Sequence, residues 1–299
     1  MEKNKSGIIP TAKDLSSQIA KNFLMGVPAV RRWRLRRPRT SIATEDINQF
    51  LATYAFSGLG HLLEHTGDLR GKTVCEIGPG DFLTSGLSIL AAGADRYAVI
   101  DRFAGDYFGE SAKRWYALIE ENWASFYPDI PWDSSLDSSK FPEDYRNRLE
   151  LIGDPIETAV TSQKYDIVCS FQVGEHVSSL DKFAEIHQRI LKPEGVGLHR
   201  VDFSAHDVWS HYHDPGTFLR FPEFIWNLTG SNRGVPNRYR HHEFLEAFER
   251  ARLDVEILAI DYTDPDKVDF NKLNKRFRSM PKESVLAESA IYRLKRRPS

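Results

Sequence analysis

A series of short apolar segments begins near residue 72 and alternates with stretches of helical periodicity, and this pattern constrains the fold most. Strands that alternate with helices build mostly parallel sheets, so the order predicts an α/β fold. We expect a seven-stranded sheet with helices on both of its faces. The expected strands span residues 73–77, 96–101, 149–152, 165–171, 195–201, 255–260 and 289–294.

Several helices can be placed between these strands. They are expected over residues 83–91, 112–123, 180–191 and 242–252. Ser178 and Asp181 have the spacing of a capping box at the start of the third of these helices. Pro193 and Gly195 are of the types that end a helix. The stretch over residues 127–147 is rich in Pro, Ser and Asp, and we interpret it as a loop.

Two domains are expected. Residues 1–70 are interpreted as a basic arm and helical extension, and residues 71–299 as the α/β domain with an insertion at about 203–240. The net charge of −2 gives no general reason to expect nucleic acid as a partner. No apolar run approaches the roughly 18 residues of a spanning helix, and charges interrupt the N-terminus where a signal peptide would lie. A cytoplasmic protein is expected, with Cys75 and Cys169 buried as free thiols.

The N-terminal region carries a basic arm. Residues 31–39 contain six arginines, Arg31 to Arg39, beside Trp33 and Leu35. Such a segment fits peripheral contact with an anionic membrane, a phosphorylated substrate or a partner. A solvated basic surface is the alternative interpretation.

A glycine turn follows the first strand, and acidic residues stand at the ends of three successive strands. Gly78 and Gly80 lie between a predicted strand and a predicted helix, as a nucleotide-binding loop requires. Asp101 ends the second strand, where an acid can accept ribose hydroxyls. Glu76 suits a positively charged cofactor group, and Asp154 suits the amino group of adenine. Each acid alone could cap a helix, but together they favour a cofactor site.

In this order the motifs resemble those of the class I, Rossmann-like, S-adenosylmethionine-dependent methyltransferases. The resemblance covers about residues 72–201 and includes two later motifs, Glu175-His176-Val177 and Leu191-Lys192-Pro193-Glu194-Gly195. It implies a sheet whose last strand is antiparallel and S-adenosyl-L-methionine as the cofactor. Phe82 stands where many members have a third glycine. The cofactor-binding residues that the resemblance implies are Glu76, Gly78, Pro79, Gly80, Asp101, Arg102, Asp154, Phe171 and Gln172.

His176 is the candidate catalytic residue. It follows the fourth strand, where members of the family line the substrate side, and a histidine can accept a hydroxyl proton at cellular pH. The alternative is a structural histidine at a helix start. No metal is expected, because relatives that bind a divalent ion use Glu-x-x-Glu-His and this chain has Gln172 in the first position.

The insertion over residues 203–240 is dense in histidine and aromatic side chains and is expected to act as a substrate lid. Its histidines also suggest zinc, but no strong ligand motif accompanies them. Arg233, Arg238 and Arg240 near its end could grip an anionic group of the acceptor. The candidate substrate residues are His206, His211, Tyr212, His213 and Arg240.

These observations predict methyl transfer, most readily O-methylation, to a small-molecule, sugar- or lipid-linked acceptor. An NAD(P)-dependent oxidoreductase shares the glycine turn and the ribose acid, but Glu76 and Leu83 disfavour it, since Leu83 stands where the third glycine of the dinucleotide motif would fall. A non-catalytic binding protein with the same fold is the other alternative. The complete set of acids argues against it, because binding a partner does not require them.

Overall fold

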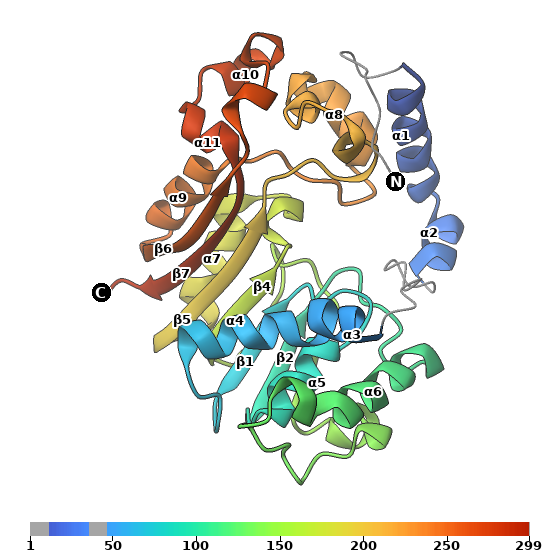
Figure 1. The fold of residues 1–299 in the computed structure, drawn as a ribbon, viewed down its shortest axis with the longest axis vertical. Helices are drawn as coiled ribbons and strands as arrows, with labels where there is room; N and C mark the ends of the chain where they lie inside the picture. The colour runs from blue at the N-terminus through green and yellow to red at the C-terminus, as the bar shows by residue number, and fades with distance from the viewer. Residues whose placement is uncertain (1–11, 36–46, 299) are drawn as a thin grey trace.

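The computed structural model describes residues 12–35 and 47–298, and its centre is one seven-stranded sheet (Figure 1). The strand order is β3-β2-β1-β4-β5-β7-β6. β7 runs antiparallel to both of its neighbours, and the other adjacent pairs are parallel. The predicted Rossmann-like α/β fold with an antiparallel last strand is confirmed. The strands are β1 Thr73–Ile77, β2 Arg96–Ile100, β3 Leu149–Ile152, β4 Tyr165–Phe171, β5 Leu191–Asp202, β6 Leu253–Tyr262 and β7 Ala287–Arg296.

The strand order reverses direction at β1, which has β2 on one side and β4 on the other. Connections from the carboxyl ends of β1 and β4 therefore diverge to opposite sides of the sheet. In open α/β sheets this divergence leaves a crevice where ligands bind. The glycine turn, Asp101 and His176 all follow strands at this edge.

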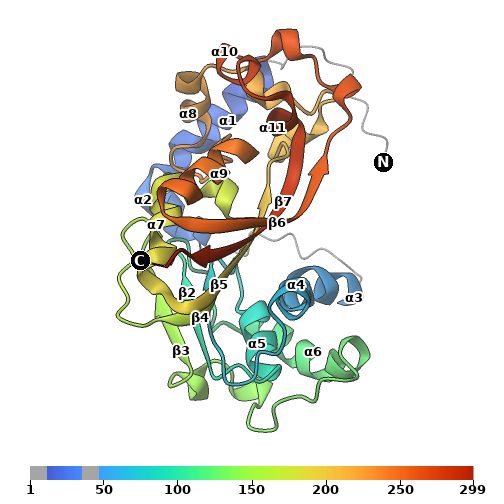
Figure 2. The ribbon, with the colours of Figure 1, turned by 90° about the vertical axis from the view of Figure 1, so that its left-hand side faces the viewer.

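Helices cover both faces of the sheet (Figure 2). Alternation along β1 places Val74 in the core with α4, α5 and α6, and places Cys75 and Ile77 in the core with α7 and α9. Both cysteines are free and buried, as expected. The covering helices are α4 Ser57–Thr66, α5 Thr84–Ala91 and α6 Glu110–Phe126 on one face, and α7 Leu180–Ile190 and α9 His241–Arg250 on the other.

The described parts of residues 1–70 lie in two places. α1 Ala12–Met25 and α2 Pro28–Leu35 lie beside the insertion, where the Asn22 amide donates to the Leu228 carbonyl at 3.0 Å (Figure 1). The later helical segments are α3 Ile47–Phe50, the π-helix Leu51–Phe56 and α4, and they bury Phe50, Phe56 and Leu59 in the sheet core instead. Arg36, Arg37 and Arg39 of the basic arm lie outside the described residues.

The insertion has a core of its own, which a second insertion between β6 and β7 completes. Trp209, Phe218 and Trp226 of the first insertion pack with Phe277 and Val285 of the second. The second insertion was not predicted, because its segments are too short to show periodicity. The elements are the 3₁₀ turns Asp207–His211 and Thr217–Arg220 with α8 Glu223–Gly230, and the 3₁₀ turns Pro265–Lys267 and Phe270–Lys272 with α10 Lys275–Arg278 and α11 Lys282–Leu286.

Two local predictions were wrong. The side chain of Ser179, not Ser178, caps α7 by accepting from the Lys182 amide, while Ser178 donates to Glu157. Residues 191–195 belong to β5 rather than to a helix end, because Leu191 pairs with Tyr165 and a register shift accommodates the residues between. Residues 127–147 form a loop as predicted, with short 3₁₀ turns at Ser138–Lys140 and Glu143–Tyr145.

No helix of the described residues is long and apolar enough to span a membrane.

A buried histidine pair makes the stability of this fold depend on pH. His187 Nε2 lies 2.7 Å from His199 Nε2, and both side chains are fully buried. Burial lowers the pKa of His187 to about 4, whereas an unfolded histidine titrates near 6.5. Between these values the unfolded chain binds the proton and the folded chain does not. Stability is therefore complete above about pH 6.5 and falls as pH falls towards 4.

We expect the free energy of unfolding to be about 2 kcal/mol lower at pH 5 than at pH 7 from His187 alone. Urea denaturation at the two pH values measures this loss. The His187→Gln variant removes the titrating group and should lose less stability over the same interval. Equal losses in both proteins would show that His187 does not couple folding to protonation.

Candidate functional site

The glycine turn has the backbone geometry of a ligand-binding loop. Gly78 and Gly80 have φ values of 68° and 87°, in the region that favours glycine. A Cβ atom on Gly78 would lie 2.7 Å from Val173 Cγ2, in the loop after β4. A Cβ on Gly80 would have no neighbour within 4 Å. The turn thus lets the β4 loop approach closely at one glycine and leaves open space at the next, with Pro79 between them.

Glu76 lies in β1, two residues before the first glycine of this turn, and bonds to the neighbouring elements. It is buried on the face of β1 that α5 covers, and its Oε2 accepts hydrogen bonds from Ser85 Oγ at 2.6 Å and from the Tyr97 hydroxyl. Burial raises the pKa of Glu76. These bonds tie β1 to the first turn of α5 and to β2. Glu76 therefore holds the glycine turn in place, and its direct contact with a cofactor stays a prediction.

Asp101 lies next to the glycine turn at the end of β2. Its Oδ1 accepts from the Phe103 amide at 2.7 Å, which fixes the loop that follows. That loop returns to the glycine turn, since a Cβ on Gly105 would lie 2.2 Å from the Asp81 carbonyl oxygen. Arg102 stacks its guanidinium on the Phe103 ring, 4.2 Å from the centroid. The loops after β1 and β2 thus form one continuous edge.

A buried hydroxyl at this edge has no hydrogen-bond partner. Tyr107 is 3% exposed, and its hydroxyl is one of the few unsatisfied buried groups in the part of the chain that the structure describes. Burial, followed by the nearby Asp101 carboxylate, raises the pKa of Tyr107, so the hydroxyl keeps its proton. An unpaired buried donor costs stability unless a ligand or water satisfies it. The group fits a site that holds a polar ligand.

The other predicted cofactor residues are more loosely placed. Asp154 is exposed just after β3, and Gln172 is exposed with a φ of 60° in the loop after β4. The ring of Phe171 packs towards α4, where a Cβ on Gly58 would lie 3.0 Å from it. These residues border the same edge of the sheet. Their contacts with a cofactor stay predictions.

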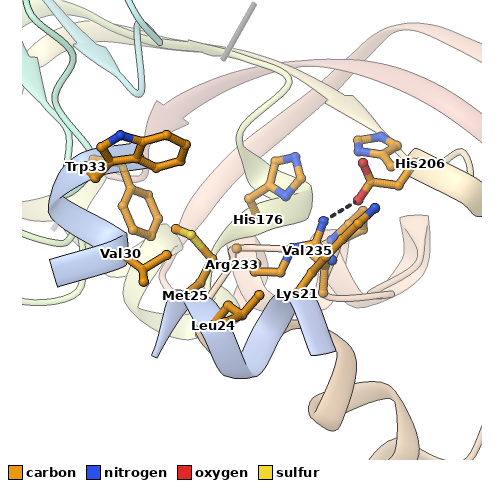
Figure 3. A pocket seen from close by; sticks show the side chains of 13 residues that line it. Lys21, Leu24, Met25, Val30, Trp33, His176, His206, Arg233 and Val235 are labelled. Carbon is orange, nitrogen blue, oxygen red and sulfur yellow. Dashed lines mark hydrogen bonds and ion pairs between the residues drawn. The ribbon is translucent and has the colours of Figure 1, made fainter. Parts of the chain in front are cut away.

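His176 faces a cavity of about 530 Å³ beside this edge (Figure 3). Its Nδ1 atom is buried and has no hydrogen-bond partner. Burial, followed by the nearby His206, lowers the pKa of His176 to about 4. The imidazole is therefore neutral at cellular pH, and a neutral imidazole carries a lone pair on one of its two nitrogens that can accept a proton.

The cavity has one apolar wall and one polar wall. Met25, Val30 and Trp33 of α1 and α2 lie on one side, and His176 and His206 lie on the other (Figure 3). The remaining lining residues are Lys21, Leu24, Phe103, Asp207, Arg233, Gly234, Val235 and Pro236. The mixed wall suits a molecule that has both an apolar part and polar groups.

Two carboxylates lie behind the histidines. Glu175 Oε1 is 3.9 Å from His176 Nε2, and burial raises the pKa of Glu175 to about 8. Asp202 ends β5, and its Oδ2 is 3.3 Å from His206 Nε2. Burial alone would raise the pKa of Asp202, but hydrogen bonds from His206 and Ser204 outweigh it and lower the pKa to about 2. Sequence reasoning did not place these acids in the site, and the position of Asp202 at a strand end was the available signal.

The five candidate substrate residues are separated in space. His206 lines the cavity, while His211 and His213 are exposed and are not among its lining residues in the described chain. Tyr212 is buried and donates to Asp14 of α1 at 2.6 Å. Arg240 is 2% exposed and donates to four backbone carbonyls, those of Phe203, Ser284, Val285 and Ala287. The proposed role of Arg240 in gripping the acceptor is therefore wrong, because its donors already bind these carbonyls.

Comparisons with known proteins give structural matches only. No family model and no curated protein matches the chain. An S-adenosylmethionine-dependent methyltransferase from Mesorhizobium loti is 11% identical, with a TM-score of 0.45 over 82% of this chain and 100% of that chain. A TehB-like S-adenosylmethionine-dependent methyltransferase from Corynebacterium glutamicum is 12% identical, with a TM-score of 0.41 over 90% and 96%. YcgJ from Bacillus subtilis is 13% identical, with a TM-score of 0.43 over 81% and 99%.

Proposed function

We propose that this chain is an S-adenosylmethionine-dependent methyltransferase. The observation that carries the proposal is the pairing of the glycine turn with Asp101 where the sheet reverses its strand order. Gly78 and Gly80 adopt left-handed conformations there, and Asp101 directly follows β2, whose last residue Ile100 pairs with Ile77 of β1. The unpaired Tyr107 hydroxyl at the same edge supports a polar ligand.

Residues 71–299 would form the cofactor-binding domain in this proposal. Gly78, Pro79 and Gly80 would bind the methionine part, Asp101 and Arg102 the ribose side, and Asp154 the adenine. Phe171 and Gln172 would border the pocket near the sulfonium. When bound, S-adenosyl-L-methionine supplies an electrophilic methyl group. The chain's own contribution is to align the acceptor, since direct displacement depends above all on positioning.

The acceptor would bind in the cavity between α1–α2 and His176. The apolar wall formed by Met25, Val30 and Trp33 would hold a hydrophobic part, and His176 would accept the hydroxyl proton of the acceptor. Lys21 adds a cationic group at the same opening. This arrangement supports O-methylation of a small-molecule or sugar- or lipid-linked acceptor.

Calorimetric titration with S-adenosylmethionine and, separately, with NADH tests the cofactor. Binding of S-adenosylmethionine without binding of NADH is the expected result. Binding of NADH alone would favour an oxidoreductase, and binding of neither would favour a non-catalytic protein. The purified chain suffices for the measurement, since no acceptor is needed.

The N-terminal helices also support a peripheral contact with anionic membrane. Phe23 of α1 is 77% exposed, Val27 is exposed in the turn between α1 and α2, and Arg31 and Trp33 are exposed on α2. Exposed apolar side chains next to cationic ones favour binding at a lipid surface. This contact would bring the cavity opening, which Trp33 lines, close to a lipid-linked acceptor.

We expect the Phe23→Glu/Val27→Glu variant to lose most binding to vesicles that contain an anionic phospholipid. Two acidic side chains would remove apolar contact and repel the surface. Co-sedimentation with the vesicles measures the bound fraction. Val160→Glu, at a site 80% exposed in the β3–β4 connection, is the matched control. Equal binding by all three proteins would exclude the contact.

A further inference from the structure

Three side chains from two neighbouring strand ends meet at the polar wall of the cavity. Glu175 comes from the turn after β4, Asp202 ends β5, and His206 follows four residues later. One oxygen or nitrogen atom from each residue lies within 4.8 Å of those of the other two. The spacing allows one cation to contact all three side chains after small rotations.

The cluster also contains an unsatisfied buried group. Glu175 is 2% exposed, and its Oε1 has no hydrogen-bond partner. Its Oε2 accepts a long bond, 3.5 Å, from the Asp202 amide. A buried carboxylate is costly unless a cation or a set of donors compensates it. The free oxygen lies on the side of His176, which lines the cavity.

We propose that Glu175, Asp202 and His206 bind a divalent first-row transition-metal ion at the wall of the acceptor cavity. Two carboxylates and one imidazole form a mixed oxygen and nitrogen set that suits Mn²⁺, Fe²⁺ or Zn²⁺. Ca²⁺ fits less well because it takes six to eight oxygen ligands. Three protein ligands leave coordination positions open towards the cavity, where oxygen atoms of the acceptor can bind.

This proposal replaces the sequence-based expectation of no metal. That expectation depended on Gln172, which lies where metal-binding relatives have a carboxylate. The structure supplies the second carboxylate from another strand, because β4 and β5 are adjacent and parallel and so bring Asp202 beside Glu175. The spacing of Asp202 and Glu175 in the sequence gives no hint of this pairing.

A network without an ion is the competing explanation. Asp202 and His206 form an ion pair at 3.3 Å, and a protonated Glu175 would need no cation. A second group of possible ligands, His61, Glu64 and His65, lies on α4. Its three residues lie within two turns of a single helix, and Glu64 is exposed. It serves as the control for adventitious binding.

The test is titration of chelator-treated full-length protein with Mn²⁺, followed by electron paramagnetic resonance of the free ion. We expect one tight Mn²⁺ per chain and an electron spin-echo signal from one coordinated imidazole nitrogen. Glu175→Gln and Asp202→Asn should each weaken binding by about tenfold or more, and His206→Gln should remove the nitrogen signal. His61→Gln/His65→Gln should leave both readouts unchanged.

The proposal is overturned if no stoichiometric site is found, or if only the control variant reduces binding. Asp202 is more exposed than Glu175, so Asp202→Asn keeps the test decisive if Glu175→Gln does not fold. Thermal unfolding of each variant establishes that the fold is intact. The titration uses no S-adenosylmethionine, so its failure is distinguishable from failure of the proposed methyl transfer.

Discussion

Replacing His176 by alanine is expected to lower the turnover of methyl transfer about 10²–10⁴-fold, the usual range for loss of an acid–base group. The imidazole lines the acceptor cavity, its Nδ1 atom has no hydrogen-bond partner, and its low pKa keeps it neutral. Affinity for S-adenosylmethionine should change little, because the glycine turn and Asp101 would hold the cofactor. Transfer of a radiolabelled methyl group to an acceptor found by screening small-molecule extracts measures turnover.

The matched control is His213→Ala, since His213 is exposed and is not among the lining residues of the cavity. Its turnover should stay close to that of the unmodified chain. A His176→Ala variant with near-normal turnover would show that the acceptor loses its proton without this base. A joint loss of stability, cofactor affinity and turnover would show a structural histidine instead.

The Asp101→Ala variant should bind S-adenosylmethionine about tenfold to more than a hundredfold more weakly than the unmodified chain. The carboxylate would accept hydrogen bonds from the ribose hydroxyls, and a charged hydrogen-bonding group contributes about 1.5–3 kcal/mol. Calorimetry gives the dissociation constants. Asp101→Asn is the more conservative change, because its amide oxygen can still accept the bond from the Phe103 amide that fixes the loop.

Asp95→Ala provides the control for this experiment. Asp95 is exposed and precedes β2, so it lies at the amino end of this strand, whereas Asp101 lies at the carboxyl end. Its removal should leave cofactor affinity unchanged. If Asp101→Ala and Asp101→Asn both bind as tightly as the unmodified chain, Asp101 does not belong to the cofactor site.

The strands were predictable because their signal is local. The segment from Tyr165 to Phe171 is almost entirely apolar after its first residues, as a strand covered on both faces must be, and its bounds match β4. The glycine turn was predictable for the same reason, since the left-handed backbone at Gly78 and Gly80 depends on the residue type. The start of β5 was missed because Pro193 and Gly195 commonly end helices, while pairing with β4 decides that they lie in a strand.

The hydrogen-bond partners of Glu76 and Arg240 could not be predicted from the sequence. Glu76 lies where the sequence indicates a cofactor contact, but its Oε2 accepts from Ser85 and Tyr97. Arg240 lies in a cationic cluster of the sequence, but the fold buries it among backbone carbonyls. In both cases the partners come from other elements, so residue type alone does not separate a ligand contact from a structural bond.

The sequence by itself determined the order of strands and helices, the glycine turn and the acids at the strand ends, because each depends on neighbouring residues along the chain. Tertiary structure alone decided that α1 and α2 form a wall of the cavity, and that Glu175, Asp202 and His206 meet beside it. These contacts join segments far apart in the sequence or on different strands. Only the packing of the sheet and its insertions sets such distances, because no local pattern records which distant side chains become neighbours.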